Sequence, residues 1–264
     1  MFDVPNIPRS FFMNVGESSA NIALSLTTAK QQTVVRITGG CGYMSDKDAD
    51  GLYELYNQAL FGYKGAIMFG GTRMLHKHDK HTVVPGITEV VPRIKTKNPD
   101  CVVLGVVPRT ESVNIDFDYG FVIEDDENAW ITVPHPDQDF FVLLQRSVDQ
   151  PATWDDEWQE CYRVIKRLRN VCNWQSLLIA YNGGNVTERE IVAISKEGWP
   201  VLLVHGGGRK TDEYATNTEF LTAHPNVKVC SKDVTSFRNA LIDMGILLGF
   251  KKQLNFQVIP GGKI

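Results

Sequence analysis

The sequence lacks several features that would place it in a specialised class of protein. Its five cysteines are scattered and form no CxxC pair, which favours reduced thiols over a disulfide framework or a zinc site. No apolar run is long enough to cross a membrane, and the N-terminal residues lack the basic and apolar regions of a signal peptide. We therefore expect a cytoplasmic protein with no membrane partner.

An excess of basic charge is also missing. The chain has 27 Lys and Arg residues against 31 Asp and Glu residues, which gives a formal net charge of −4. Proteins that bind nucleic acid usually carry a basic excess, so we expect no nucleic-acid partner. The 264 residues, 43% of them hydrophobic, are sufficient for a large buried core.

Two common nucleotide motifs are absent. The sequence contains no GxxxxGK[ST] loop and no GxGxxG motif in its usual place after the first strand. These absences argue against a P-loop NTPase and against an ordinary nicotinamide-dependent dehydrogenase.

What the chain does contain is a regular alternation of short apolar runs and amphipathic segments. The predicted strands are 33–38, 66–69, 101–107, 177–181, 200–204 and 227–229, and the predicted helices are 50–61, 87–97, 155–171, 187–196, 211–220 and 233–248. Such alternation predicts an α/β protein with a Rossmann-like, doubly wound, mostly parallel sheet and helices on both faces.

We expect one domain over residues 1–264, with two regions that do not follow the alternation of strands and helices. Residues 1–32 look irregular, with at most a short edge strand and a loop. Residues 108–153 read as a long inserted connection with one or two short strands, and connections of this length often bind ligands. Pro92 is expected to kink or shorten the helix over 87–97.

Four predicted strands end in glycine clusters, which begin at Gly39, Gly70, Gly183 and Gly206. In an open parallel sheet, ligands bind outside the carboxyl ends of the strands, where following helices direct their N–H groups. The four turns together predict a crescent that binds a phosphate-bearing ligand, although each glycine pair alone also suits tight packing. The candidate ligand-binding residues are Gly39, Gly40, Gly70, Gly71, Thr72, Arg73, Gly183, Gly184, Asn185, Thr187, Gly206, Gly207, Gly208 and Arg209.

Some of these side chains have a second interpretation. Arg73 and Arg209 are placed either to bind a phosphate through two parallel hydrogen bonds or to lie in solvent as ordinary surface arginines. Thr72 and Thr187 are suited to capping a helix, to binding a phosphate, or to both.

The histidine-rich stretch HKHDKH is the strongest candidate for a metal site. Its histidines, His76, His78 and His81, do not share one helical face, and two lysines between them would repel a cation. We therefore expect a polar, mobile loop that closes over an anion, with no metal site and no cofactor.

The stretch NGGNVTERE (182–190) resembles the PGGxGTxxE signature of the SLOG superfamily, which includes the Lonely Guy phosphoribohydrolases. The match keeps Gly183, Gly184, Thr187 and Glu190, and it departs from the signature at Asn182 and Val186. Val186 replaces the third glycine, and a β-branched residue resists positive φ. This departure argues more strongly against hydrolysis than against binding.

Three further stretches resemble the SLOG region of melastatin-type TRP channels and its free-standing prokaryotic relatives. They are VVRITGGCG (34–42), IDFDYGFVIEDDENAW (115–130) and GWPVLLVHGGGRKTDEYA (198–215). The resemblance runs from about residue 33 to 215. It implies a Rossmann-like fold that binds a nucleotide or a derivative such as ADP-ribose.

The resemblance also implies a role for the last residue of the signature. In the hydrolases the final glutamate, which corresponds to Glu190, does chemistry together with an arginine on a neighbouring element; Arg73 and Arg93 are the candidates here. From the residues alone, Glu190 lies one turn into a helix, where a carboxylate suits the positive end of the dipole.

Three hypotheses follow. The first is a binding or sensing protein for an ADP-ribose- or NAD-derived ligand, which we expect to form homo-oligomers, with an effector partner as a further possibility. The second is an N-glycosidase, similar to the phosphoribohydrolases, that acts on nucleoside 5′-monophosphates through Glu190. The third is a structural subunit with a vestigial site.

Overall fold

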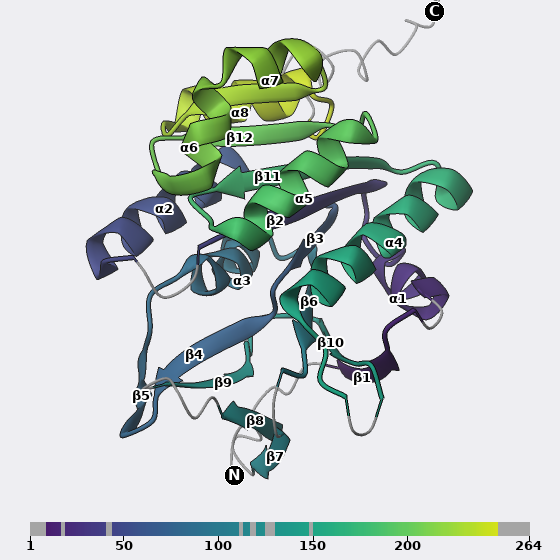
Figure 1. Cartoon of the computed structure of the whole chain (residues 1–264), viewed down its shortest axis with the longest axis vertical. Coiled ribbons are helices and arrows are strands. Elements are labelled where there is room, and N and C mark those ends of the chain that lie inside the picture. Colours follow the sequence, from purple (N-terminus) through teal and green to yellow (C-terminus); the bar gives the residue numbers. More distant parts are fainter. Residues whose placement is uncertain are drawn as a thin grey trace, which may run out of the picture.

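Strands and helices alternate along the chain and form an eight-stranded parallel sheet with helices on both faces (Figure 1). The structure, a computed structural model, describes residues 9–16, 19–40, 44–110, 113–116, 120–124, 130–147 and 150–247. The strand order is β1-β10-β6-β3-β2-β11-β12-β13. The predicted Rossmann-like, doubly wound architecture is confirmed. The strands are β1 (Arg9–Asn14), β2 (Thr33–Gly39), β3 (Ala66–Phe69), β6 (Val102–Pro108), β10 (Phe140–Gln145), β11 (Gln175–Tyr181), β12 (Val201–His205) and β13 (Val227–Ser231).

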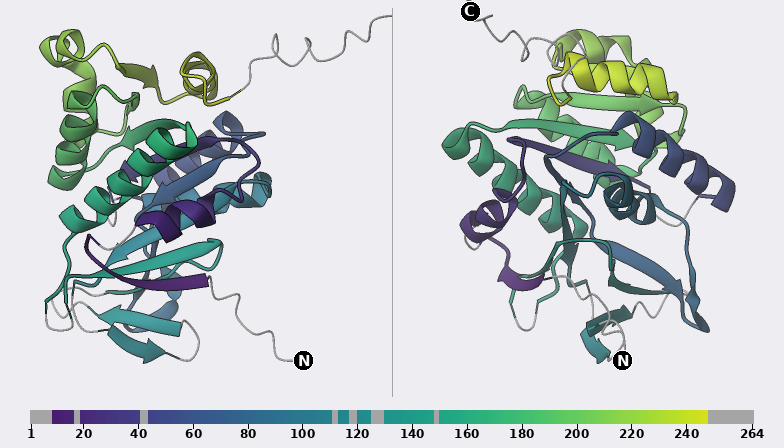
Figure 2. Two further views of the ribbon diagram at one scale, coloured as in Figure 1. Left: turned by 90° about the vertical axis from the view of Figure 1, so that its right-hand side faces the viewer. Right: turned by 180° about the vertical axis from the view of Figure 1, so that it is seen from behind.

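Two hydrophobic clusters, one on each face of this sheet, form the core. The first cluster joins the sheet to α1, α4, α5, α6 and α7. The second joins it to α2, α3 and α8, the helices on the face that the right-hand view of Figure 2 turns towards the reader. The strands are buried on both faces, as their continuous apolar runs predict. The helices are α1 (Ser19–Leu26), α2 (Asp46–Ala59), α3 (Ile87–Lys97), α4 (Trp154–Cys172), α5 (Asn185–Lys196), α6 (Arg209–Thr216), α7 (Thr218–Ala223) and α8 (Val234–Asp243).

The chain leaves the centre of the sheet in two directions. From β2 it proceeds through β3 and β6 to β10, and from β11 it proceeds through β12 to β13. The switch point of the topology therefore lies between β2 and β11, whose last residues, Gly39 and Tyr181, are in register. Open α/β sheets bind ligands at this position.

A second, antiparallel sheet lies beyond the carboxyl ends of β2 and β3. Its strand order is β5-β4-β9-β8-β7. Its strands are β4 (Thr72–His76), β5 (Asp79–Val83), β7 (Val113–Asp116), β8 (Gly120–Glu124) and β9 (Trp130–Pro134). The described part of residues 108–153 thus holds four strands, β7 to β10, rather than the one or two expected. The expected mobile loop at His76 and His78 is a β4–β5 hairpin, because β4 also pairs with β9 along its whole length.

Two other expectations need correction. The segment 1–32 contains the edge strand β1 and the helix α1, whose Ile22 and Leu26 belong to the core. Helix α3 keeps the full span 87–97 through Pro92. No described helix combines the length and apolar character that a membrane crossing requires.

The second sheet approaches the first where two glycines meet. Gly71 precedes β4 and has φ +64°, and a Cβ atom placed on it would lie 2.7 Å from the Cα atom of Gly105 in β6. Contacts that short do not occur in folded proteins, so the two backbones approach closely only because neither residue carries a side chain.

Replacing Gly71 with alanine should therefore destabilise the protein by about 2 kcal/mol or more, from the left-handed backbone and the collision with β6. The matched control is Gly51→Ala in α2, where an added Cβ meets nothing within 4 Å. This change should stabilise the protein by about 0.5–1 kcal/mol. Denaturant unfolding of both variants measures the difference, and equal effects would contradict the role of the glycine contact.

Candidate functional site

A cavity of about 340 Å³ lies at the switch point, between the carboxyl ends of β2 and β3 and the second sheet. Its volume falls in the range of small-molecule sites, roughly 300–1,000 Å³. The first turns of α3 and α5 and the start of α4 also contribute to its wall. The lining residues are Arg36, Ile37, Thr38, Gly39, Phe69, Gly70, Thr72, Met74, Ile87, Thr88, Thr110, Ile123, Trp130, Thr132, Trp154, Glu157, Val186 and Thr187.

Arg36 is the charged residue at the centre of this wall. It occupies a middle position of β2, is 4% exposed, and faces the α4 and α5 side of the sheet, where the strand otherwise presents Val34. Its Nε donates to Glu190 Oε1 of α5 at 2.8 Å, and its Nη1 lies 2.9 Å from Glu157 Oε1 of α4. A strand and two helices thus meet at one guanidinium group.

Two carboxylates share this single positive charge. Burial raises the pKa of Glu157 to about 7; Arg36 opposes the rise and Glu190 adds to it. For Arg36, burial opposes the charge, but the two carboxylates outweigh it and raise the pKa. The Cys161 thiol also donates to Glu157, and burial raises the pKa of that thiol. Glu157 is therefore a buried carboxyl group whose pKa lies well above the ordinary value.

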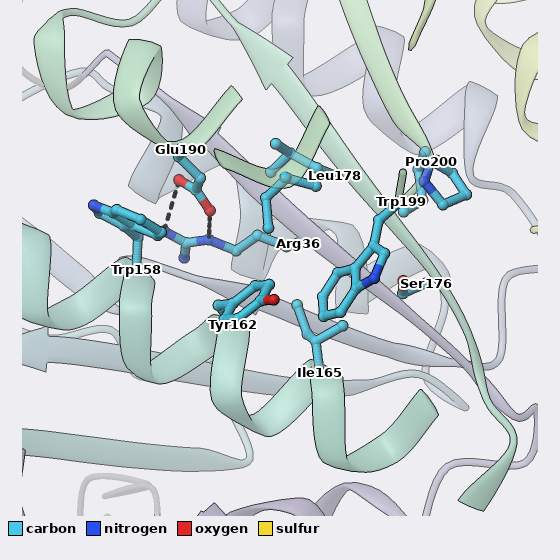
Figure 3. Close-up of a pocket in the computed structure, with 11 residues that line it drawn as sticks. Arg36, Trp158, Tyr162, Ile165, Ser176, Leu178, Glu190, Trp199 and Pro200 are labelled. Atoms are coloured by element: carbon cyan, nitrogen blue, oxygen red, sulfur yellow. Dashed lines mark hydrogen bonds and ion pairs between the residues drawn. The ribbon is translucent and has the colours of Figure 1, made fainter. Parts of the chain in front are cut away.

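Glu190 lies on the other side of Arg36 from the cavity. Figure 3 shows its carboxylate hydrogen-bonded to Arg36, with Trp158 and Tyr162 of α4 beside the guanidinium group. The crevice on that side has a volume of only about 10 Å³, enough for at most one water molecule. The residue predicted to be catalytic is thus a partner of Arg36, and Glu157 is the carboxyl group that lines the cavity.

Aromatic and hydroxyl groups line the rest of the cavity. Trp130 comes from β9 of the second sheet, and Trp154 is the first residue of α4. The Trp154 ring lies beside Gly70, at 3.5 Å from the position that a Cβ atom would take. Threonines supply hydroxyl groups, and one pair, Thr38 and Thr187, has its Oγ1 atoms 3.4 Å apart.

The structure places the four predicted glycine turns after four neighbouring strands, β3, β2, β11 and β12. Arg209 connects three of these turns, because its guanidinium atoms would lie 3.2 Å from a Cβ atom added to Gly40 and 2.8 Å from one added to Gly184. Of the glycines, only Gly39 and Gly70 line the cavity itself. Cys41 and Gly42 of the second turn lie outside the described residues.

The turn after β12 already holds a negative charge from its own chain. The carboxylate of Asp212 in α6 accepts hydrogen bonds from the N–H groups of Gly206, at 3.0 Å, and Gly208, at 2.9 Å. Gly207 packs against the ring of Tyr181. Two of the candidate ligand-binding residues, Gly206 and Gly208, thus already donate their N–H groups to Asp212.

Arg73 and Arg93, the two arginines considered as partners of Glu190, lie elsewhere. Arg73 forms a two-point ion pair with Glu89 of α3, at 2.7 and 3.2 Å, and Arg93 lies over the ring of Tyr53. Burial would raise the pKa of Glu89, but hydrogen bonds from His135 and Arg73 lower it to about 2. The arginine that pairs with Glu190 is Arg36.

The two threonines considered as helix caps do not have that role. Thr72 is the first residue of β4, and Thr187 lies inside α5, whose N-cap is Gly184. Asn185 is the first residue of α5. No group of three His, Cys, Asp or Glu side chains that could hold a metal ion occurs within the described part of the chain.

Sequence reasoning missed Arg36, Glu157, Trp130 and Trp154 as site residues. A signal for Arg36 was present, because a lone arginine inside a strand buried on both faces requires a carboxylate partner. Its partners are 121 and 154 residues away, and the acidic start of α4 has an adequate local explanation in the helix dipole.

The fold and the cavity define a doubly wound α/β protein with a ligand-sized site at the switch point of its sheet. The chain belongs to the SLOG family: the family described as "SLOG in TRPM, prokaryote" matches residues 32–236. The resemblance noted over residues 33–215 is thereby confirmed.

Solved structures with a similar chain path include a molybdenum cofactor carrier protein and a molybdenum cofactor binding protein. The molybdenum cofactor carrier protein of Chlamydomonas reinhardtii is 15% identical, with a TM-score of 0.48 over 82% of this chain and 100% of its own. The molybdenum cofactor binding protein of the phototrophic bacterium Rippkaea orientalis is 16% identical, with a TM-score of 0.47 over 83% and 100%. No curated protein matches the sequence. Family membership therefore rests on the match over residues 32–236.

The raised pKa of Glu157 predicts how stability depends on pH. Between the ordinary carboxyl pKa near 4.5 and about 7, the folded state binds more protons at this group than the unfolded state does. Stability should therefore fall as pH rises through this window, by at most about 3 kcal/mol. Glu157→Gln should remove this contribution, whereas Glu219→Gln, at an exposed site, should leave it unchanged.

Urea unfolding at pH 5, 6, 7 and 8 tests this prediction. The free energy of unfolding of the wild type, relative to that of Glu157→Gln, should decrease across the series. The lowered pKa of Glu89 has no effect in this window, because its contribution is lost only as pH falls towards about 2. A constant difference between wild type and Glu157→Gln would show that Glu157 is ionised throughout.

Proposed function

We propose that the protein binds a nucleotide-derived ligand of the ADP-ribose or NAD-derived class in the cavity at the switch point. The observation that carries this proposal is the composition of the cavity wall, to which two tryptophans, a buried arginine and the first turns of two helices contribute. An aromatic ring suits a base, and helix N-termini suit phosphate groups. The SLOG family match supports the same proposal.

The electrostatics of the wall favour binding over turnover. Arg36 is held in place between Glu157 and Glu190 before any ligand arrives. A guanidinium group whose position is fixed in this way is suited to recognising a ligand without large rearrangement. We place the base near Trp130 and Trp154 and the phosphate near the first turns of α3 and α5.

A panel of ADP-ribose, NAD, AMP and GMP tests ligand binding by thermal shift and titration calorimetry. A ligand at a hundred times its Kd should stabilise the protein by about 2.7 kcal/mol. Trp154→Ala should weaken binding by roughly 5-fold to 150-fold, because base stacking on an aromatic ring contributes roughly 1–3 kcal/mol. Phe61→Ala, an exposed aromatic residue on no wall of the cavity, is the control and should leave Kd unchanged.

If none of the four compounds shifts the melting temperature, the proposal is wrong. Equal weakening by Trp154→Ala and Phe61→Ala would show that the nucleotide binds outside the cavity.

The second candidate function is hydrolysis of the N-glycosidic bond of a nucleoside 5′-monophosphate. The observation that favours it is Glu157, which lines the cavity and has a pKa near 7. In such a reaction the bond from ribose C1′ to the base nitrogen breaks, Glu157 gives its proton to the leaving base, and water adds at C1′ and returns a proton to Glu157. Glu190 would orient Arg36 without touching the substrate.

An assay for free base released from AMP or GMP, measured by chromatography, distinguishes the two functions. For a hydrolase, Glu157→Gln should abolish release and retain binding, while Glu190→Gln should lower turnover less. For a binding protein, the wild type binds the nucleotide and leaves it intact for hours at neutral pH.

A further inference from the structure

Three acidic side chains beside the cavity wall, in the first turns of α3 and α4, each have a basic partner. The pairs are Glu89 with Arg73, Asp155 with Arg189, and Asp156 with Arg146. Arg36 instead serves two acids, because its Nε donates to Glu190 and its Nη2 donates to Glu157. The side chains of this triad are each 5% exposed or less. The triad therefore carries one uncompensated negative charge whenever both acids are ionised.

A buried excess charge is costly, so the triad favours a proton on one of its two acids. The hydrogen-bond donors place this proton on Glu157. Glu190 accepts from both Nε and Nη2 of Arg36, whereas Glu157 accepts from Nη2 and from the Cys161 thiol. Burial raises the pKa of Glu157 to about 7, and it also raises the pKa of Cys161, which stays protonated near neutral pH. Arg36, Glu190 and Cys161 are thus the groups that set the charge of Glu157.

Glu157 is the acid of the triad that lines the cavity, whereas Glu190 lies on the other side of Arg36 (Figure 3). Among the described residues of the cavity wall, Arg36 and Glu157 are the only ionisable ones. The described part of the wall therefore has no further base that could offset an ionised Glu157. Charges in a poorly solvated site act on one another over several ångströms, so an anion in the cavity is repelled by this charge without touching the carboxyl group.

We infer that the cavity binds its anionic ligand together with one proton, which is taken up from solvent and held by Glu157. This inference rests on the proposed nucleotide site and adds a control by pH to it. With Glu157 protonated the triad is neutral and accepts an anion, and with Glu157 ionised the triad repels it. By reciprocity, a bound anion strengthens the binding of the proton. The site therefore holds its ligand in neutral and mildly acidic solution and releases it as pH rises.

Titration calorimetry with ADP-ribose tests this inference, because heats measured in buffers of different ionisation enthalpy give the number of protons taken up. The two negative charges of ADP-ribose do not titrate between pH 5.5 and 8, unlike the phosphate of AMP, whose second pKa is about 6. The wild type should take up almost no proton at pH 5.5 and close to one at pH 8. Its affinity should fall by up to about tenfold per pH unit above pH 7. Adenosine, which is neutral, should bind without proton uptake.

Two substitutions separate the charge of the triad from its packing. Glu157→Gln keeps the shape and removes the titrating group, so proton uptake should disappear and Kd at pH 8 should match Kd at pH 5.5. Glu190→Gln leaves Arg36 and Glu157 as a one-to-one pair, so Glu157 should stay ionised and proton uptake should again be lost. Glu219→Gln makes the same change at an exposed site and should behave as the wild type. Unfolding curves establish that each variant is folded.

A wild-type Kd for ADP-ribose that stays constant from pH 5.5 to 8 overturns the inference and leaves the nucleotide site standing. Proton uptake that persists in Glu157→Gln also overturns it, because another group then takes the proton.

Failure of the proposed function has a different signature, which inorganic sulfate reveals, because this dianion does not titrate in the same pH range. If sulfate binds with a proton uptake that Glu157→Gln removes, while ADP-ribose does not bind, the inference holds and the nucleotide assignment is wrong. If neither compound binds, both proposals are wrong.

Discussion

The site depends on one buried arginine that two carboxylates share. Removing a guanidinium group from water costs several kcal/mol, and the cost is offset only when its hydrogen bonds are made. Nε and Nη2 of Arg36 meet this requirement with Glu190 of α5 and Glu157 of α4, whereas Nη1 has no hydrogen-bond partner among the described residues. The two helices are thereby fixed to the strand beside which the cavity opens. A change in the charge of this triad therefore alters both the electrostatics of the cavity and the packing of its wall.

The sequence was sufficient to predict the parallel sheet and the edge that carries the site. Runs such as Leu177–Tyr181 and Val201–Val204 are short and apolar, and glycine follows them within two residues. This pattern is typical of buried strands in a parallel sheet. The helix expected over 187–196 is α5, which begins two residues earlier, at Asn185. The four glycine turns lie together because parallel strands place all their carboxyl ends at one edge.

The second sheet and the charged triad were harder to predict for two different reasons. The strands between residues 113 and 134 are short, and β9, which joins them to the rest of the sheet, pairs with β4 far away in the sequence, so no local pattern separates them from a loop. Glu157 resembles the other acids at the start of α4, and only the fold shows that it faces Arg36. At the turn after β12, Asp212 folds back onto glycine amides, a contact that depends on the turn's conformation.

The contact of Gly71 with Gly105 has a further consequence for how the cavity changes in relatives. It brings the second sheet close to β6, and Ile123 of β8 adds a side-chain contact with Val107, Phe141 and Leu143 of the first sheet. Neither contact involves Trp130 or Thr132 of β9, which line the cavity. Substitutions at these two positions in relatives can therefore change the ligand preference while both contacts keep the two sheets together.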